Sequence, residues 1–237
     1  MKVTVLVTCE HASNRVPPHL QAALGLGARR LDSHAAYDEG AEHVARALGR
    51  RFGTRPILGE VTRLAIDLNR SPHNPRRWST AAGELDEASR ERLQDIYARH
   101  WARVDTRVRQ AVADGRFVAH VGVHSFVAVL RGQVRPMDIG LLYDPARPRE
   151  RALAAGWLRE LRRLDPTLVV RRNAPYRGVA DGLTRDMRRR FADRRYAGIE
   201  LELNQRRLQG GRFSRALVEV VVEGLAAALA AFRPDRV

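Results

Sequence analysis

Apolar residues along the chain repeat with two different periods, and this alternation predicts the order of the secondary structure. Residues 2–8 (KVTVLVT) form a short apolar run of the kind found in strands that are covered on both faces of a sheet. Comparable runs, bounded by glycine and polar residues, predict further strands at 55–59, 63–69, 117–124, 138–143, 167–172 and 197–204.

Other segments repeat their apolar residues every three to four positions, which is the period of an amphipathic helix. This spacing predicts helices over 38–52 and roughly 85–113, a helix around Leu153, Trp157 and Leu161, and a final helix capped by Ser214. Because strands and helices alternate, we predict an α/β fold with helices on both faces of a sheet. The length favours a single domain over residues 1–237.

The charge balance narrows the choice of partner. The chain has 42 Lys and Arg against 27 Asp and Glu, a net charge of +15. Lys2 is the only lysine, and the arginine runs at 171–172 and 188–190 are short. No aromatic residues are interleaved with them to stack on bases. We interpret these runs as solvated surface and expect no nucleic-acid partner.

Cysteine usage and hydropathy indicate a cytoplasmic protein. Cys9 is the single cysteine, so an internal disulfide is excluded; we interpret it as a small buried hydrophobe. The N-terminal segment lacks the long apolar core of a signal peptide. The apolar run 216–232 is interrupted by Glu219 and Glu223, which predicts a buried helix and not a membrane span.

Reactive side chains gather where the predicted strands end. They are Glu10 and His11 after the first strand, Asp67, Asn69 and Arg70 in DLNR, His124 and Ser125 after 117–123, and Glu200 and Glu202 in 197–203. In α/β folds ligands bind beyond the carboxyl ends of the strands. Imidazole and carboxylate groups are ligands of catalytic Zn²⁺, and a separate glutamate can act as general base. The sequence therefore predicts a metal site at this edge.

The other histidines fit a metal site less well. His43 and His100 lie within helical patterns, and His19 and His73 lie in proline-rich loops. We interpret these four as structural or solvated. His120 alternates with apolar residues along its strand and is expected to flank the core.

Five motifs together resemble the N-formylglutamate amidohydrolase family, from about residue 4 to 208: CEH, TRLAIDLNR, VHSF, GLLYD and GIELE. The resemblance implies a zinc-carboxypeptidase-like fold, with three α/β/α layers and a mixed, twisted central sheet. It also implies Zn²⁺-dependent hydrolysis of an N-acyl amino acid, such as N-formyl-L-glutamate in histidine degradation. The substrate would be small and anionic, with no membrane partner.

The resemblance assigns His11 and His124 as metal ligands. In the wider superfamily a glutamate follows the first histidine by three residues, but Asn14 stands at that position here. Asp38, at the start of the predicted helix, is favoured as the third ligand. The alternatives for this ligand are Glu10, Asn14 and His34.

The remaining roles follow from the same resemblance. Arg63 would polarise the scissile carbonyl, and Glu200 would act as general base, with Glu202 beside it. The expected substrate contacts are Asn69, Arg70, Asn14 and Ser125, with Asn69 and Arg70 clamping a carboxylate. Segment 181–198 departs from the family pattern, which leaves the acyl group and the amino acid open.

Two functions from other classes stay open. The substitution at Asn14 is compatible with a weakly active or non-catalytic relative that binds an acidic small ligand. The net charge is compatible with a basic nucleic-acid-binding protein, whose binding would weaken steeply with salt.

Overall fold

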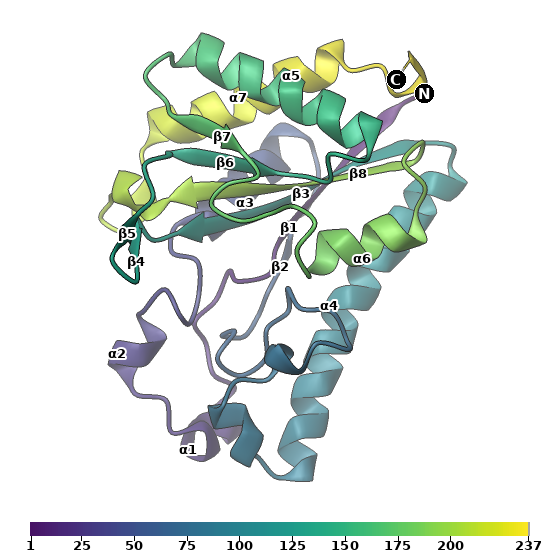
Figure 1. Cartoon of the computed structure of the whole chain (residues 1–237). Helices are drawn as coiled ribbons and strands as arrows, with labels where there is room; N and C mark the ends of the chain where they lie inside the picture. The colour runs from purple at the N-terminus through teal and green to yellow at the C-terminus, as the bar shows by residue number, and fades with distance from the viewer. Residues whose placement is uncertain (237) are drawn as a thin grey trace.

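A mixed six-stranded sheet forms the centre of the molecule in the computed structural model, which describes residues 1–236 (Figure 1). In spatial order the strands are β2 (Ile57–Leu58), β1 (Val3–Cys9), β3 (Phe117–Phe126), β8 (Tyr196–Asn204), β6 (Ile139–Leu142) and β7 (Val170–Arg172). The first four are parallel, whereas β6 runs antiparallel to β8 and parallel to β7. The predicted α/β fold with a mixed central sheet is confirmed.

Helices cover both faces of this sheet. One face carries α3 (Ala41–Arg51), α5 (Pro148–Leu164) and α7 (Arg215–Ala231), and the other carries α4 (Glu87–Ala113) and α6 (Leu183–Arg190) (Figure 1). Successive strand residues point to opposite faces, so Val7 and Cys9 enter the core beneath α3 while Leu6 enters the core beneath α4. The two layers explain why β1 is apolar along most of its length.

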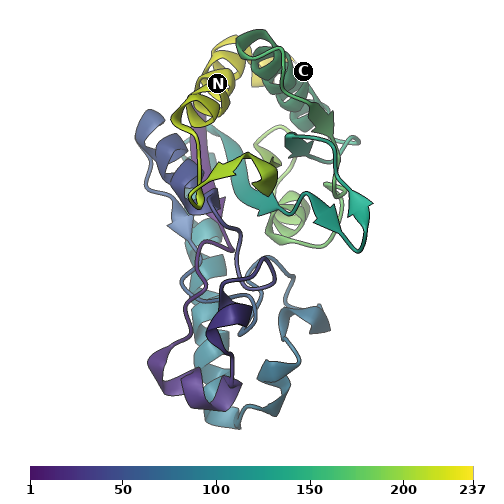
Figure 2. The same ribbon diagram turned by 90° about the vertical axis from the view of Figure 1, so that its left-hand side faces the viewer.

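Shorter elements extend the molecule beyond the sheet. They are α1 (Gln21–Leu24), α2 (Ala28–Leu31), the hairpin of β4 (Val129–Leu130) and β5 (Gln133–Val134), the hairpin of β9 (Leu208–Gln209) and β10 (Arg212–Phe213), and short 3₁₀ turns. Figure 1 and Figure 2 show α1, α2 and the loops before α4 at the end of the molecule where that long helix begins. No helix within residues 1–236 combines the length and apolarity that a bilayer crossing needs.

The strand predicted over residues 63–69 is absent from the described structure. Its apolar residues are buried, but its one β-type contact is an isolated bridge between Ile66 and Trp78. Its backbone pairs with other loops instead; the N–H of Asp67, for example, donates to the carbonyl of Arg77 at 2.7 Å. The prediction was wrong because a short apolar run indicates that a segment is buried but does not distinguish a strand from a packed loop.

The helix predicted over 38–52 begins at Ala41, and this later start leaves Asp38 in a turn. Gly40 precedes the helix with a φ of +79°, a conformation that favours glycine. A Cβ atom there would lie 2.7 Å from the Leu208 side chain, so the turn also needs the small residue. The backbone N–H of Asp38 donates to the carbonyl of His11 at 2.9 Å, which brings Asp38 to the end of β1.

Arg188 is buried inside the fold, contrary to the interpretation of 188–190 as solvated surface. Its Nε donates to Glu150 at 2.9 Å, and its other nitrogens donate to the carbonyls of Gly178 and Gly198. The relative exposure of Glu150 is 0%. The pair therefore joins α5, α6 and β8 through one charged contact, while Arg189 and Arg190 remain exposed.

Replacing Arg188 with methionine is expected to destabilise the protein by about 3 kcal/mol, because the buried Glu150 carboxylate then keeps Arg147, at 3.1 Å, as its one ion-pair partner within residues 1–236. Urea unfolding followed by circular dichroism measures this change. The matched control is Arg189→Met on the exposed side of α6, which should shift the free energy of unfolding by less than about 0.5 kcal/mol. If Arg188→Met and Arg189→Met unfold at the same urea concentration, the structural role of Arg188 is contradicted.

Candidate metal centre

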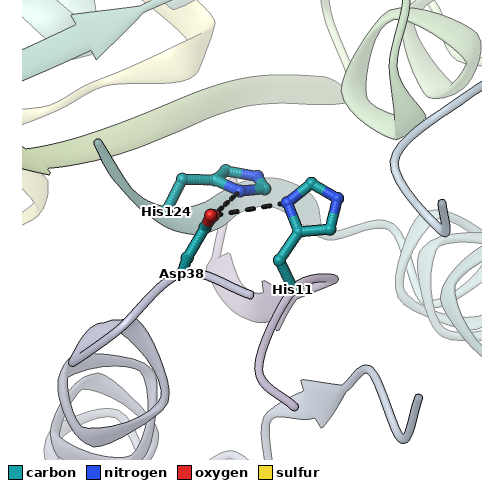
Figure 3. Close-up of side chains that lie close together, drawn as sticks. All are labelled: His11, Asp38 and His124. Atoms are coloured by element: carbon teal, nitrogen blue, oxygen red, sulfur yellow. Dashed lines mark hydrogen bonds and ion pairs between the residues drawn. The ribbon is translucent and has the colours of Figure 1, made fainter. Parts of the chain in front are cut away.

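The carboxyl ends of β1 and β3 and the turn before α3 bring the predicted metal ligands together. His11 lies in the turn after β1, and His124 lies near the end of β3. The turn before α3 adds Asp38. Figure 3 shows both imidazole rings directed at the Asp38 carboxylate. These side chains are 4–5% exposed, so the group is shielded from bulk water.

A single carboxylate oxygen, Oδ2 of Asp38, faces the Nδ1 atoms of both histidines (Figure 3). The distances from Oδ2 are 3.3 Å to His11 and 2.9 Å to His124. One ligand atom from each residue lies within 4.8 Å of the other two. A tetrahedral Zn²⁺ with bonds of about 2.0–2.1 Å holds its ligand atoms about 3.3 Å apart, so the spacing fits this ion.

The second nitrogen of each ring contacts a further carboxylate. Nε2 of His11 lies 2.7 Å from Oδ1 of Asp67, and Nε2 of His124 lies 3.1 Å from Oε2 of Glu10. An ionised carboxylate only accepts hydrogen bonds, so each Nε2 carries a proton and a neutral ring then has a lone pair on Nδ1. When both rings are neutral, two such lone pairs and the Asp38 oxygen converge on one point and could hold a metal ion.

The pKa values show how strongly this point attracts positive charge. Burial raises the pKa of Asp38, but the charges of Arg63 and His11 outweigh it and hold the pKa well below its usual range. Burial likewise raises the pKa of Asp67, and His11 offsets this to leave it at about 2. Burial lowers the pKa of His124, yet hydrogen bonds to Asp38 and Glu10 raise it well above normal. Ionised carboxylates thus surround the two imidazoles.

A cavity of about 290 Å³ opens onto this group. Its lining includes the predicted site residues His11, Asp38, Arg63, Asn69, Arg70, His124, Ser125, Glu200 and Glu202. Asn14 is not brought to the cavity, because its side chain turns away and donates to Asp32 at 3.2 Å. Of the alternative ligands, His34 lines the cavity, whereas Glu10 lies behind His124.

Arg63 reaches the centre from the irregular segment that replaces the predicted strand. Its guanidinium forms an ion pair with Oδ1 of Asp38 and donates to the carbonyl of His34 at 3.2 Å. These contacts leave Oδ2 of Asp38 for the two histidines. The same segment therefore supplies a cation that orients the carboxylate and also lines the cavity.

Asn69 and Arg70 are fixed by the first residue of α6 and by the turn before it. Oδ1 of Asn69 accepts the backbone N–H of Leu183 at 2.9 Å. Arg70 lies 3.4 Å from Asp67 and donates to the carbonyl of Asp181 at 3.1 Å. The ion pair with Asp67 is present, and the side chain still borders the cavity.

Glu200 and Glu202 both line the cavity, as expected for residues two apart on one strand. Oε1 of Glu200 accepts the Thr184 hydroxyl at 2.9 Å. Glu202 lies opposite His124 in the β3–β8 register, and its Oε2 has no hydrogen-bond partner within residues 1–236. Burial raises the pKa of Glu202 to about 8.

Several contributors to the site were not assigned a role from the sequence. Asp67 lies in the DLNR motif, which could have identified it as the partner of His11. Thr184 and Asp181 lie at the start of α6 and in the turn before it, within the divergent segment 181–198. Tyr176, by contrast, lines the cavity from a loop without periodicity, and the sequence carries no signal for it.

Comparison with known proteins gives a matching family and several similar solved structures, including the following two. The model of the family described as N-formylglutamate amidohydrolase matches residues 3–208. A gene product of Agrobacterium tumefaciens is 31% identical, with a TM-score of 0.82 over 96% of this chain and 90% of that chain. The N-formylglutamate amidohydrolase from Ralstonia eutropha is 18% identical, with a TM-score of 0.68 over 97% and 93%. Among curated proteins no match is found.

Proposed function

Since the chain belongs to the N-formylglutamate amidohydrolase family, whose members are hydrolases acting on C–N bonds, we propose that it hydrolyses the amide bond of an N-formyl or other N-acyl amino acid, such as N-formyl-L-glutamate. The convergence of Asp38 Oδ2 and the Nδ1 atoms of His11 and His124 carries this proposal. These three residues would hold Zn²⁺. A bound zinc ion supplies Lewis-acid polarisation of the carbonyl and lowers the pKa of a water molecule.

Two side chains of the cavity would act on the reacting atoms. The Arg63 guanidinium would donate hydrogen bonds to the carbonyl oxygen as negative charge develops there. A carboxylate oxygen of Glu200 would take a proton from the attacking water and pass it to the leaving amine nitrogen. Thr184 orients this carboxylate, because its hydroxyl donates a hydrogen bond to Oε1 of Glu200 at 2.9 Å.

Asn69 and Arg70 would bind the carboxylate of the substrate. Arg70 has a planar guanidinium that can donate two parallel hydrogen bonds to one carboxylate. Asn69 lies beside it, with its amide nitrogen 3.4 Å from Nε2 of His124. Ser125 borders the same cavity, and its hydroxyl donates to the carbonyl of Glu39 at 2.8 Å. An anionic substrate would thus be oriented with its amide towards the metal ligands.

Replacing Arg70 with lysine is expected to lower kcat/KM roughly 30- to 1,000-fold, which corresponds to about 2–4 kcal/mol. The reason is that a lysine ammonium group cannot donate two parallel hydrogen bonds to one carboxylate, as a guanidinium can. Steady-state kinetics on an N-acyl amino acid measures this loss, and thermal unfolding shows whether the ion pair to Asp67 contributes separately. The control is Arg76→Lys on an exposed arginine. A variant at Arg70 with the parental kcat/KM would contradict the carboxylate clamp.

The proposed activity is tested by screening Zn²⁺-loaded protein against N-formyl, N-acetyl and N-formimino derivatives of Glu, Asp, Gln and His. Release of the acyl acid and the free amino acid is followed by chromatography, with Zn²⁺-treated His124→Ala protein as control. We expect turnover of at least one acidic derivative by the parent and none by the variant. A parent that holds stoichiometric Zn²⁺ but hydrolyses none of these compounds would favour the non-catalytic relative that binds an acidic ligand.

A further inference from the structure

The carboxylate behind His124 belongs to Glu10, which is 2% exposed and does not border the cavity. Its Oε2 lies 3.1 Å from Nε2 of His124. A Cβ atom on Gly59 would lie 1.9 Å from the carbonyl oxygen of Glu10, so the backbone here is closely packed against the neighbouring segment. Glu10 is therefore held in place on the side of His124 that faces away from Asp38.

The second oxygen of this carboxylate points towards α4. Oε1 of Glu10 and Nε2 of His100 are both buried, and neither has a hydrogen-bond partner within residues 1–236. They lie 3.8 Å from each other, a separation too short to hold a water molecule between them. His100 is 4% exposed, and its neighbour Trp101 anchors this turn of α4 by donating to the carbonyl of Leu68 at 2.9 Å.

We propose that His124, Glu10 and His100 form a buried triad that fixes the metal-binding form of His124. This inference rests on the proposed metal centre and adds two positioning residues to it. A neutral imidazole carries its proton on either nitrogen, and the partner of one nitrogen decides which nitrogen faces the metal. The Glu10 carboxylate accepts a hydrogen bond and cannot donate one, so it keeps the proton on Nε2 and presents Nδ1 to Asp38 and the metal.

His100 acts through Glu10 and not on the metal. By facing Oε1, it keeps the carboxylate oriented so that Oε2 remains on His124. It also supplies the second polar neighbour that a fully buried carboxylate needs. Without His100, Oε1 of Glu10 would lose this polar neighbour, and the carboxylate would be free to rotate away from His124. The sequence analysis interpreted His100 as structural or solvated, and the proposed structural role is its contact with Oε1 of Glu10.

The triad differs from the other histidine–carboxylate contact of the centre. Asp67, which contacts His11, also pairs with Arg70, and Arg70 lines the cavity. Substrate binding can therefore perturb Asp67, whereas Glu10 and His100 lie outside the cavity lining. Variants of the triad should change metal affinity first and leave the substrate contacts in place.

Zn²⁺ affinity, measured by competition with a chromophoric chelator, tests the triad. We expect Glu10→Gln to weaken Zn²⁺ binding about 10- to 100-fold and His100→Phe about tenfold, as for other residues that orient metal-binding histidines. The matched control is His120→Phe, because His120 is equally buried but bonds to Thr8 and Tyr196 instead. This control should bind Zn²⁺ within about twofold of the parent, even if its melting temperature falls as far as that of His100→Phe.

A structural readout separates tautomer control from general destabilisation. In long-range ¹H–¹⁵N spectra of the Zn²⁺-loaded parent, His124 should show a proton on Nε2 and metal on Nδ1, and Glu10→Gln should shorten the lifetime of that proton. Zn²⁺ affinities of Glu10→Gln and His100→Phe within twofold of the parent would overturn the proposal. So would metal on Nε2 of His124, or a parent that takes up no Zn²⁺.

The two proposals fail in different ways. A parent that binds Zn²⁺ with the expected His124 tautomer, but hydrolyses no N-acyl amino acid, removes the proposed activity and leaves the triad. Unchanged Zn²⁺ affinity in both triad variants of an active enzyme removes the triad and leaves the activity.

Discussion

Replacing either His11 or His124 with alanine is expected to abolish stoichiometric Zn²⁺ binding and, with it, hydrolysis. Each variant removes one of the three side chains whose ligand atoms converge within 4.8 Å, and the two that remain do not fill a tetrahedral site. Metal content by mass spectrometry, measured after chelator treatment and reloading with Zn²⁺, gives the result. Circular dichroism should show that the α/β fold is retained.

The exposed His19 provides the matched control for the metal measurement, because its replacement removes an imidazole without touching the cavity. His19→Ala should keep one Zn²⁺ per chain. Asp38→Asn tests the third ligand and should also lose the metal, whereas His34→Ala should keep it. Full occupancy in His11→Ala or His124→Ala would show that the ion, if bound, lies elsewhere.

Replacing Glu200 with glutamine should lower kcat roughly 10²- to 10⁴-fold while Zn²⁺ remains bound, because an amide of the same shape cannot accept the proton. Glu202→Gln should be milder, at about tenfold. With its pKa raised to about 8 by burial, Glu202 is largely protonated at neutral pH and is a poorer proton acceptor there. Single-turnover kinetics with metal-loaded protein measures both variants.

The control for this pair is Glu219→Gln on the exposed face of α7, which should leave kcat unchanged. Near-normal turnover by Glu200→Gln combined with a large loss in Glu202→Gln would reverse the two roles. That outcome has a structural basis, since Glu202 lies opposite His124 in the strand register and has an unpartnered oxygen.

Regular elements were predictable because their apolar periodicity reflects the two cores. β1, β3 and β8 and the helices α4 and α7 lie close to their predicted ranges, and Ser214 caps α7 by accepting the Leu217 N–H at 3.2 Å. The strand prediction at 63–69 was wrong because a loop packed under α4 needs the same apolar residues as a strand. Arg188 shows a second limit, because burial of an arginine depends on Glu150, a distant partner.

The candidate site was predictable where strand ends define it. His11 and His124 follow or end parallel neighbours of one sheet, so their proximity follows from topology. Asp38 required the family resemblance, because the path of the loop between His11 and α3 is not encoded in any periodic pattern. Asn14 was misplaced for the same reason, and the contact between Glu10 and His100 depends on how α4 packs against β1.

The sequence separations within the centre would give a bound metal a role in holding the chain together. His11 and Asp38 are 27 residues apart, and Asp38 and His124 are 86 residues apart. An ion shared by all three would act as a reversible cross-link that closes both loops and binds the folded chain in preference to the unfolded one. At a free Zn²⁺ concentration 1,000 times the dissociation constant, such linkage contributes about 4 kcal/mol to folding. Protein handled in chelating buffers is then the more easily unfolded and proteolysed form.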